Sequence, residues 1–292
     1  MSDLHATVKA IVEDSSFGVE SVCETLNVNR AAFYAWKAGE PSERQRSDDE
    51  LASVVRELFW KHRRRYGSRR LIKDLAEQGV KCGRRRVAKT LKSQGLIAIQ
   101  PKSFKPQTTE SRHRLGYSPN LLLEGEEPSA LHRLWVGDIT YIPLQGGSFC
   151  YLALLMDRFS RRIVGFSLAA TMTEDLVLAA LSQAIRQRQA PAGLIHHTDR
   201  GGQYAGKRYR GVLSRAAMRQ SMSRPDNVYD NAFMESCFGT LKTELEMTEY
   251  PHQRTAHKAL SEYIAYYNLE RKHSSLGYLA PHRFEAQSLK RT

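Results

Sequence analysis

The chain has 292 residues, a formal net charge of +13, and 41% hydrophobic and 26% charged residues. This length accommodates two or three domains, and the hydrophobic share suffices for a buried core, which excludes a wholly disordered chain. A chain this basic is expected to bind a polyanion, most often nucleic acid, although a ribosome-associated or membrane-surface protein carries the same excess.

The cysteines and the N-terminus exclude several other classes of protein. The four cysteines are far apart and form no C-x-x-C pair, so neither a zinc ribbon nor a disulfide framework is indicated: Cys23, Cys82, Cys150 and Cys237. They are typical of reduced thiols in a cytosolic protein. The N-terminus lacks the apolar region of a signal peptide, and no run approaches the roughly 18 apolar residues of a membrane span. We therefore expect a cytoplasmic protein that does not enter the membrane.

Residues 1–42 are predicted to form a first helix-turn-helix unit. Between residues 18 and 38, two apolar faces repeat at helical spacing around the turn "NVN", and Asn29 is placed to cap the second helix. A plain pair of packed helices fits the same spacing, so this alternative stays open. The polar stretch from Lys37 to Glu50 contains Gly39 and Pro41 and predicts a linker.

Residues 43–99 are predicted to form a second, basic helix-turn-helix unit. Two apolar helical faces lie in this range, and Gly79 and Gly95 stand where helix C-caps belong. From Glu43 to Arg114 there are twenty Lys and Arg against eight Asp and Glu, a net charge of +12. An arginine triplet at a helix start is typical of a recognition helix meeting DNA, although a solvated basic face is the alternative for any single arginine. The predicted DNA-binding residues here are Arg69, Arg70, Arg84, Arg85 and Arg86.

The pattern changes from helical to mixed after the middle of the chain. Residues 100–128 are irregular and proline-containing and predict an extended linker. Residues 129–250 read as three strands, a helix, a strand, a helix, a strand and a long helix, which predicts an α/β domain with a mixed sheet. Residues 251–292 are predicted to be a C-terminal helical extension.

Three carboxylates in the predicted α/β domain stand out by their position. Asp138 lies in the apolar strand "WVGDITYI", where a carboxylate is costly unless it is paired or metal-bound; the solvent face of an edge strand is the alternative. Asp199 comes just after the short strand "GLIHHT" and before Gly201, at the strand end where ligands bind in α/β sheets. Glu235 lies beside the apolar stripe of the long helix, and a surface glutamate is the alternative for it.

Taken together, these carboxylates indicate a site for hard divalent cations. Three carboxylates suit Mg²⁺ or Mn²⁺, with water and substrate phosphate completing the shell, and two such ions can drive an in-line phosphoryl displacement. His196 and His197 are adjacent in a strand and point to opposite faces, so they cannot chelate one metal together without a kink. One of them could support a metal-bound carboxylate, and a zinc hydrolase built on the pair is disfavoured.

Four stretches resemble the catalytic protein of the IS3 family of bacterial transposases and, more broadly, the retroviral integrase-like core: "WVGDITYI", "HHTDRGGQY", "SRPDNVYDNAFMESCFGTLKTEL" and "YYNLERKHSSLGYLAPHRF". Asp199 and Glu235 are separated by 35 residues, the spacing of a DD(35)E motif, and Lys242 matches the basic residue that this family carries seven positions later. The resemblance also covers the segment "YGSRRLIKDL…GRRRVAKTLKSQGL" and spans roughly residues 15–285.

The resemblance implies an α/β, RNase H-like mixed-sheet catalytic core preceded by all-α helix-turn-helix units. Asp138, Asp199 and Glu235 would bind two Mg²⁺ ions, for which Mn²⁺ can substitute, and Lys242 would contact DNA near them. The implied activity is cleavage at insertion-sequence ends followed by strand transfer.

The resemblance also implies partners and a location. These are the terminal inverted repeats, target DNA, further copies of the chain in a dimer or larger assembly, and an upstream protein fused by frameshifting. The implied location is the nucleoid of the bacterial cytoplasm.

Two other classes of protein compete with this interpretation. A non-catalytic DNA-binding regulator is disfavoured because the carboxylate trio is intact. An RNase H-type nuclease, which hydrolyses without joining, is disfavoured by the separate basic N-terminal half.

Overall fold

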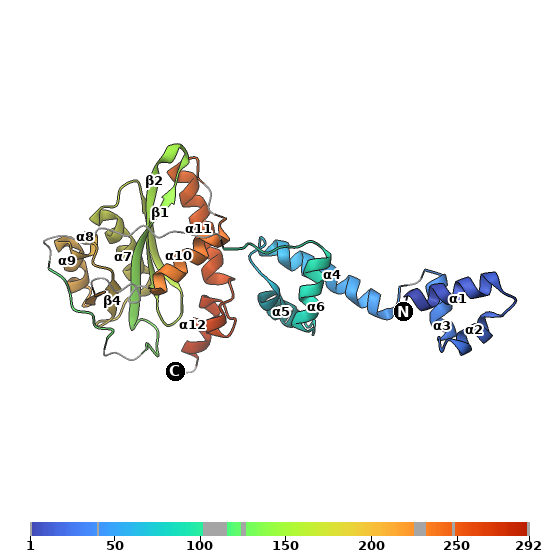
Figure 1. Ribbon diagram of the computed structural model, residues 1–292. Coiled ribbons are helices and arrows are strands. Elements are labelled where there is room, and N and C mark those ends of the chain that lie inside the picture. Colours follow the sequence, from blue (N-terminus) through green and yellow to red (C-terminus); the bar gives the residue numbers. More distant parts are fainter. Residues whose placement is uncertain are drawn as a thin grey trace. The chain divides into compact units, whose positions relative to one another are not determined.

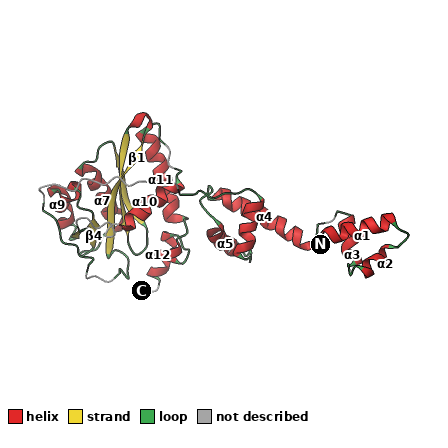
Figure 2. Cartoon of the chain, in the orientation of Figure 1, coloured by secondary structure: helices red, strands yellow, loops and turns green. Residues whose placement is uncertain are grey.

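The computed structural model describes residues 2–39, 41–101, 116–123, 127–224, 232–246 and 249–290. It divides into two compact units, Met1–Ala98 and Ile99–Thr292. Within the described ranges the first unit is helical throughout, and every strand belongs to the second (Figures 1 and 2). The finer five-part division of the sequence stays a prediction.

Three short helices form a small cluster at the N-terminus: α1 (Ser2–Asp14), α2 (Val19–Thr25) and α3 (Arg30–Lys37). They pack around the buried side chains of Val8, Val22, Cys23 and Phe33. The Asn29 side chain caps α3 by accepting a hydrogen bond of 3.1 Å from the backbone N–H of Ala32, so the predicted cap is confirmed. Helix α1 is absent from the sequence prediction.

Three further helices form the basic unit: α4 (Glu43–Lys61), α5 (Ser68–Glu77) and α6 (Arg84–Ser93). The linker predicted up to Glu50 is wrong from Glu43 onward. Ser42 and Gln45 form a capping box, in which each side chain accepts from the other's backbone N–H at 3.2 and 2.8 Å. The polar residues after Ser42 therefore form the exposed start of a helix.

Apolar residues from all three helices bury against one another: Leu51, Val55, Leu58, Phe59, Leu71, Leu75, Val87 and Leu91. Gly79 and Gly95 have left-handed backbones, with φ of +82° and +64°, and follow the ends of α5 and α6 as predicted. A buried pair of His62 and Asp74, 2.6 Å apart, ties the end of α4 to α5.

A five-stranded mixed sheet organises the second unit, in the order β3-β2-β1-β4-β5. The strands are β1 (Leu134–Pro143), β2 (Phe149–Asp157), β3 (Ile163–Ala169), β4 (Ile195–Thr198) and β5 (Arg219–Met222). β1, β2 and β3 pair antiparallel, whereas β4 pairs parallel with β1 and β5 parallel with β4. This is the RNase H-like arrangement, so the predicted fold class is confirmed. Because β1 is the central strand, Asp138 does not lie on an edge strand.

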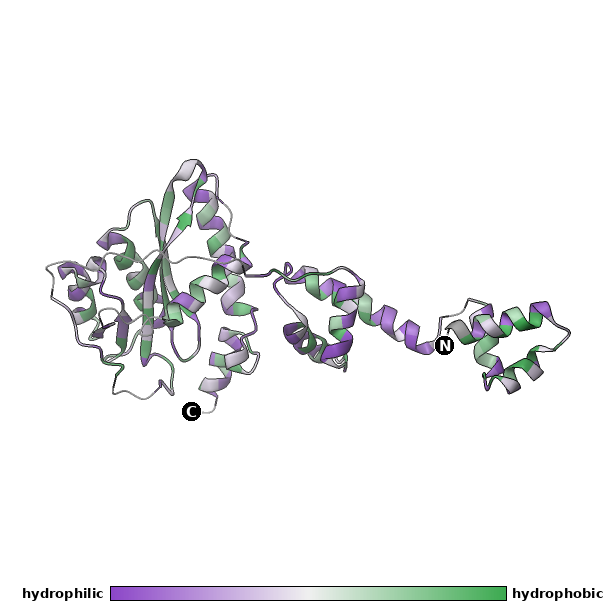
Figure 3. Cartoon of the chain, viewed as in Figure 1, coloured by the Kyte–Doolittle hydropathy of each residue, from purple (hydrophilic) through white to green (hydrophobic). Residues whose placement is uncertain are grey.

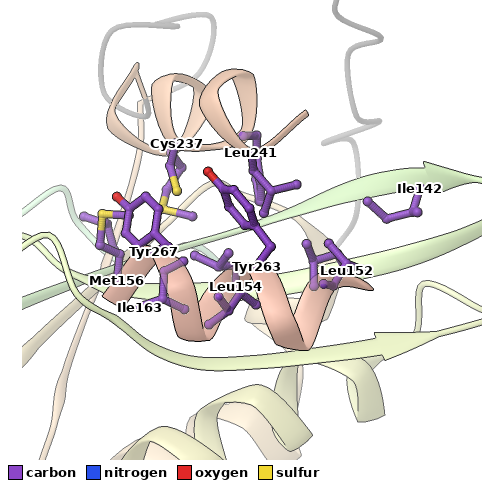
Figure 4. Packing of buried hydrophobic residues seen from close by; sticks show 14 of the residues in the cluster. Ile142, Leu152, Leu154, Met156, Ile163, Cys237, Leu241, Tyr263 and Tyr267 are labelled. Atoms are coloured by element: carbon purple, nitrogen blue, oxygen red, sulfur yellow. The ribbon is translucent and has the colours of Figure 1, made fainter. Parts of the chain in front are cut away.

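Helices cover both faces of the sheet (Figure 1). One face carries α7 (Glu174–Arg188), α8 (Gly202–Ala205) and α9 (Lys207–Arg215), and the other carries α10 (Ala232–Glu244) and α11 (Gln253–Leu269). In Figure 4, Cys237 and Leu241 of α10 meet Tyr263 and Tyr267 of α11 above the strands. The predicted C-terminal extension thus contributes α11 to the core, and α12 (Pro281–Leu289) follows it. Figure 3 shows green, hydrophobic stretches along the strands and many purple, hydrophilic residues on α5 and α6.

Side chains occupy the backbone edge of β3. The Asn268 amide accepts from the N–H of Ile163 and donates to its carbonyl, both at 2.9 Å. Gln183 accepts from the N–H of Phe166 at 2.7 Å. The outer edge of this strand is therefore bonded to α7 and α11 at these positions.

The opposite edge of the sheet is lined by the segment 116–123. Leu121 donates its N–H to the Ser221 hydroxyl at 2.9 Å, and Ser118 donates to the Gln220 side chain at 2.8 Å. Half of the predicted linker lies outside the described residues, and this part of it runs along β5.

A buried carboxylate attaches α12 to the core. Glu285 is 4% exposed and accepts hydrogen bonds from Arg162, Arg188 and Ser160 at 2.6, 2.8 and 2.8 Å. Removing one partner of such a group leaves uncompensated buried charge. Among the described residues, none of the helices is both long and apolar enough to span a membrane.

Candidate active site at the ends of β1 and β4

Asp138 and Asp199 lie level with each other on neighbouring strands. The parallel register pairs Leu134 with Ile195 and Val136 with His197, an offset of 61 residues. Asp138 and Asp199 also differ by 61 and stand two residues beyond the last pair of this register, with Asp199 directly after β4. Neighbouring parallel strands are about 4.8 Å apart, and residues at the same level project to the same face. The two carboxylates are therefore neighbours, although 60 residues separate them in the sequence.

Backbone amides orient both carboxylates. The N–H of Ile139 donates to Asp138 Oδ1 at 2.7 Å, and the N–H of Gly201 donates to Asp199 Oδ1 at 2.9 Å. A Cβ atom at Gly201 would approach Asp199 Oδ1 to 3.0 Å, so glycine allows this close turn. Both aspartates are half-buried, which keeps them reachable from solvent.

Tyr204, from α8, lies next to both aspartates. Its side chain is 1% exposed, and burial raises the pKa of its phenol well above the usual value, with further contributions from the charges of Tyr209, Asp138 and Asp199. Within the described part of the chain its hydroxyl has no hydrogen-bond partner. Sequence reasoning missed this residue, although it ends the quoted stretch "HHTDRGGQY".

Lys242 joins the site from α10. Its ammonium lies 4.3 Å from the centroid of the Tyr141 ring on β1, in cation–π geometry. Burial lowers the pKa of Lys242 to about 8, and the charge of Asp138 opposes that shift. A lysine predicted from the resemblance to act near the carboxylates therefore lies within electrostatic reach of Asp138.

Glu235 is not brought into the same cluster. It is exposed in the first turn of α10, two turns before Lys242. Among the described residues, no group of three His, Cys, Asp or Glu side chains is close enough to hold a metal ion. The sequence predicts Asp226 or Asn227 as the N-cap of this helix, and both residues lie outside the described ranges.

The two histidines support the strand from opposite sides, as predicted. His196 Nε2 lies 2.6 Å from the Tyr209 hydroxyl, and burial lowers the pKa of His196 to about 3, so it is neutral. The His197 ring lies between the hydroxyls of Ser221 and Ser223, at 2.8 and 3.2 Å. These contacts fix β4 immediately before Asp199.

The five arginines predicted to bind DNA fall into two groups. Arg69, Arg84 and Arg85 are exposed, and no hydrogen bond or ion pair engages them within the described residues. Arg86 instead donates to Asp48 and Ser47 of α4 at 2.7 and 2.8 Å. Arg70 donates to the carbonyl of Arg65 at 3.3 Å and lies 5.4 Å from the centroid of the Tyr66 ring.

Two lysines that sequence reasoning passed over extend the exposed group. Lys89 and Lys92 are exposed on α6, four and seven residues after Arg85, and so share its face of the helix. Their spacing was the signal that could have revealed them.

Family comparisons match the helical N-terminal part of the chain and the sheet-containing part to different domain models. Models described as integrase core domain match residues 128–228 and 216–281, and a model described as HTH-like domain matches residues 46–104. The class is thus an integrase-core protein with an HTH-like domain before the core.

Close relatives give the particular family. The chain is 40% identical over 265 residues to the uncharacterized 31 kDa protein of insertion element IS600 from Shigella sonnei, covering 90% of this chain and 97% of that one. It is 37% identical over 279 residues to transposase InsF of insertion sequence IS3A from Escherichia coli K12, covering 94% and 96%. The chain belongs to the family of IS3-type insertion-sequence transposases.

Solved structures with a similar core come from retroviruses. A chain of the simian T-cell lymphotropic virus intasome, in complex with PP2A regulatory subunit B56 gamma, has a TM-score of 0.46 and 19% identity over 73% of each chain. The dimeric form of the HTLV-2 integrase catalytic core domain, in complex with magnesium, has a TM-score of 0.44 and 18% identity, covering 53% of this chain and 97% of that one.

Proposed function

We propose that this protein cuts DNA at the ends of an insertion sequence and joins the ends to target DNA, with Asp138, Asp199 and Glu235 as the catalytic carboxylates. The observation that carries the proposal is the level placement of Asp138 and Asp199 on adjacent strands of an integrase-core sheet. Membership of a transposase family supports the reaction class.

The donor set fits hard divalent cations. The three proposed ligands are all carboxylates, and backbone amides orient the two aspartates beside each other. Mg²⁺, or Mn²⁺ in its place, would be held by Asp138 and Asp199, and the proposal adds Glu235 of α10, which the structure does not bring into their cluster. When bound, two ions would activate the attacking hydroxyl and stabilise the leaving oxygen.

The chain's own residues hold DNA and the carboxylates in place. The ammonium of Lys242, which lies over Tyr141, would attract a phosphate near Asp138. The exposed arginines of α5 and α6 would bind the DNA backbone. Because two ends must be brought together, further copies of this chain are the expected partners, and an upstream protein fused by frameshifting is another. We place this activity at the nucleoid in the bacterial cytoplasm.

The test is incubation of the protein with labelled inverted-repeat DNA and target DNA in Mg²⁺ or Mn²⁺. The proposal expects 3′-end cleavage and joined products from wild type and neither from Glu235→Gln. Hydrolysis without joining would favour the nuclease alternative. Tight binding without any cleavage by wild type would favour the regulator.

A further inference from the structure

Two arginines enclose one aromatic ring beside Glu235. Phe233 lies in the first turn of α10, two residues before Glu235. The guanidinium carbons of Arg158 and Arg161 each lie 3.6 Å from the centroid of its ring. Two guanidinium groups cannot both stack at this distance on one face of a ring, so they cover opposite faces. The ring is held between them.

The turn that carries both arginines is tightly braced. Asp157 is fully buried, and its Oδ1 accepts from the N–H groups of Phe159 and Ser160, both at 3.0 Å. Its Oδ2 accepts from the N–H of His132 at 2.8 Å. Arg161 has a left-handed backbone, with φ of +61°, and donates its N–H to the Asp157 carbonyl at 2.9 Å. The β2–β3 turn is therefore a rigid support for whatever the two side chains hold.

Packing one aromatic ring with two partly buried, charged arginines costs free energy that an apolar neighbour would not. Burial lowers the pKa of both Arg158 and Arg161, and the charge of Arg158 lowers that of Arg161 further. Glu127 bonds to Arg158 at 2.6 Å, and its charge opposes the lowering of the pKa at both arginines. An apolar residue would cover Phe233 without placing two like charges around one ring. The cost suggests that the position of the ring matters.

The ring is placed where α10 has the least support of its own. The first turn of a helix lacks intrahelical hydrogen bonds to its N–H groups, so it frays most readily. The buried residues of α10 fix its inner face on the sheet: Met234, Cys237, Phe238 and Leu241. Phe233 is only partly buried, on the flank of the same turn as Glu235.

We propose that Arg158, Phe233 and Arg161 form a clamp that positions Glu235 for metal binding. The clamp rests on the proposed function, since it presumes that Glu235 is a metal ligand. Phe233 is a positioning residue in this arrangement, because it acts through the helix turn and not on DNA or metal directly. Two cations hold the ring plane from both sides, which limits rotation of the first turn.

The experiment is a Mg²⁺ titration of end cleavage by the full chain, with DNA affinity measured in parallel. Phe233→Leu should raise the Mg²⁺ concentration for half-maximal cleavage about tenfold, the usual effect of losing a residue that orients a metal ligand. DNA affinity should stay at the wild-type value. Phe233→Tyr, which keeps the ring, should restore the wild-type Mg²⁺ dependence.

Matched variants keep the test decisive. Phe159→Leu changes an aromatic residue of the same turn that contacts Phe284 of α12 instead of α10, and it should leave the Mg²⁺ dependence unchanged. If Phe233→Leu does not fold, Arg161→Ala removes one cation and should shift the dependence in the same direction. A wild-type Mg²⁺ dependence in the folded variant, or loss of DNA affinity alone, overturns the clamp. Full activity of Glu235→Gln overturns the proposed function itself.

Discussion

The basic helical unit and the sheet unit use charge in opposite ways. On α5 and α6 the arginines that face solvent have flexible side chains and no fixed partner within the described residues. In the middle of β1 and directly after β4 the carboxylates are half-buried, and backbone amides orient each of them. Binding a polyanion needs accessible charge that can release counterions. Catalysis needs charge in a fixed place, with its orientation set before the substrate arrives.

The same contrast recurs within three residues of α6. Arg85 is exposed, whereas Arg86 bonds to Asp48 and Ser47 and so joins α6 to α4. The two neighbouring arginines thus differ in role: Arg85 faces solvent, whereas Arg86 faces α4 and binds to it. Substituting each arginine in turn can therefore separate the effect of a solvent-facing charge from that of a charge held by hydrogen bonds.

The largest expected effect is that of Asp199→Asn on cleavage. Losing several kcal/mol of metal-assisted stabilisation should lower the rate by about 10³-fold or more, while DNA affinity changes less than about twofold. Single-turnover cleavage and fluorescence anisotropy measure the two quantities. An equal loss of DNA affinity and of cleavage rate would mean that the two units do not divide DNA binding and catalysis between them.

A buried charge of the sheet unit should matter for stability. Glu285→Ala leaves Arg162 and Arg188 without their carboxylate and should cost about 3 kcal/mol of unfolding free energy. Denaturant unfolding monitored by the core's tryptophan fluorescence measures it, with the exposed Glu249→Ala as the control. A loss no greater than the control's would mean that this charge is dispensable.

Arg85→Ala and Arg86→Ala form a matched pair on α6. Losing Arg85 should flatten the log–log salt dependence of DNA binding by about 0.9, the slope expected for one phosphate contact. Losing Arg86 should leave this slope unchanged and lower the melting temperature of the helical unit, because its bonds to α4 disappear. Identical slopes for the two variants would mean that Arg85 lies on a solvated basic face and makes no phosphate contact.

The smallest expected effect is a change in the titration of Lys242. In the metal-free protein its pKa should lie at about 8, so the side chain is cationic below this pH and neutral above it. Asp138→Asn should lower that pKa, because the aspartate charge raises it. NMR of ¹³C-labelled lysine side chains follows both titrations. A pKa near the ordinary lysine value would separate Lys242 from the site.

Much of the core could be predicted from the sequence, for identifiable reasons. Asp138 stands in an apolar strand and Asp199 directly follows another, where a lone carboxylate is conspicuous, and the structure sets those strands side by side. Their level register depends on strand pairing, which no local pattern contains. The placement of Glu235 as a third ligand stays a prediction.

Other predictions from the sequence were wrong or incomplete because they depend on tertiary contacts. The apolar pattern of "YAGKRYRGVLSRAAM" predicts one helix, but the structure divides it at Gly206, where a Cβ atom would lie 2.0 Å from Glu174 Oε1. That carboxylate accepts the N–H of Tyr209 at 2.9 Å, so the chain bends around it. No local pattern singles out Tyr204, because only the fold brings it close to the two aspartates. Arg86 could not be told from Arg85 without knowing where α4 packs.

The bonded edges of the sheet limit how copies of this chain can associate. At β3 the Asn268 and Gln183 side chains occupy the backbone groups of Ile163 and Phe166, and at β5 the carbonyl of Pro119 accepts the backbone N–H of Met222 at 3.4 Å. A neighbouring molecule adding a strand there would first have to displace these groups, which protects the protein against edge-to-edge aggregation. The strands that position the carboxylates, β1 and β4, lie inside the sheet and away from both of these edges.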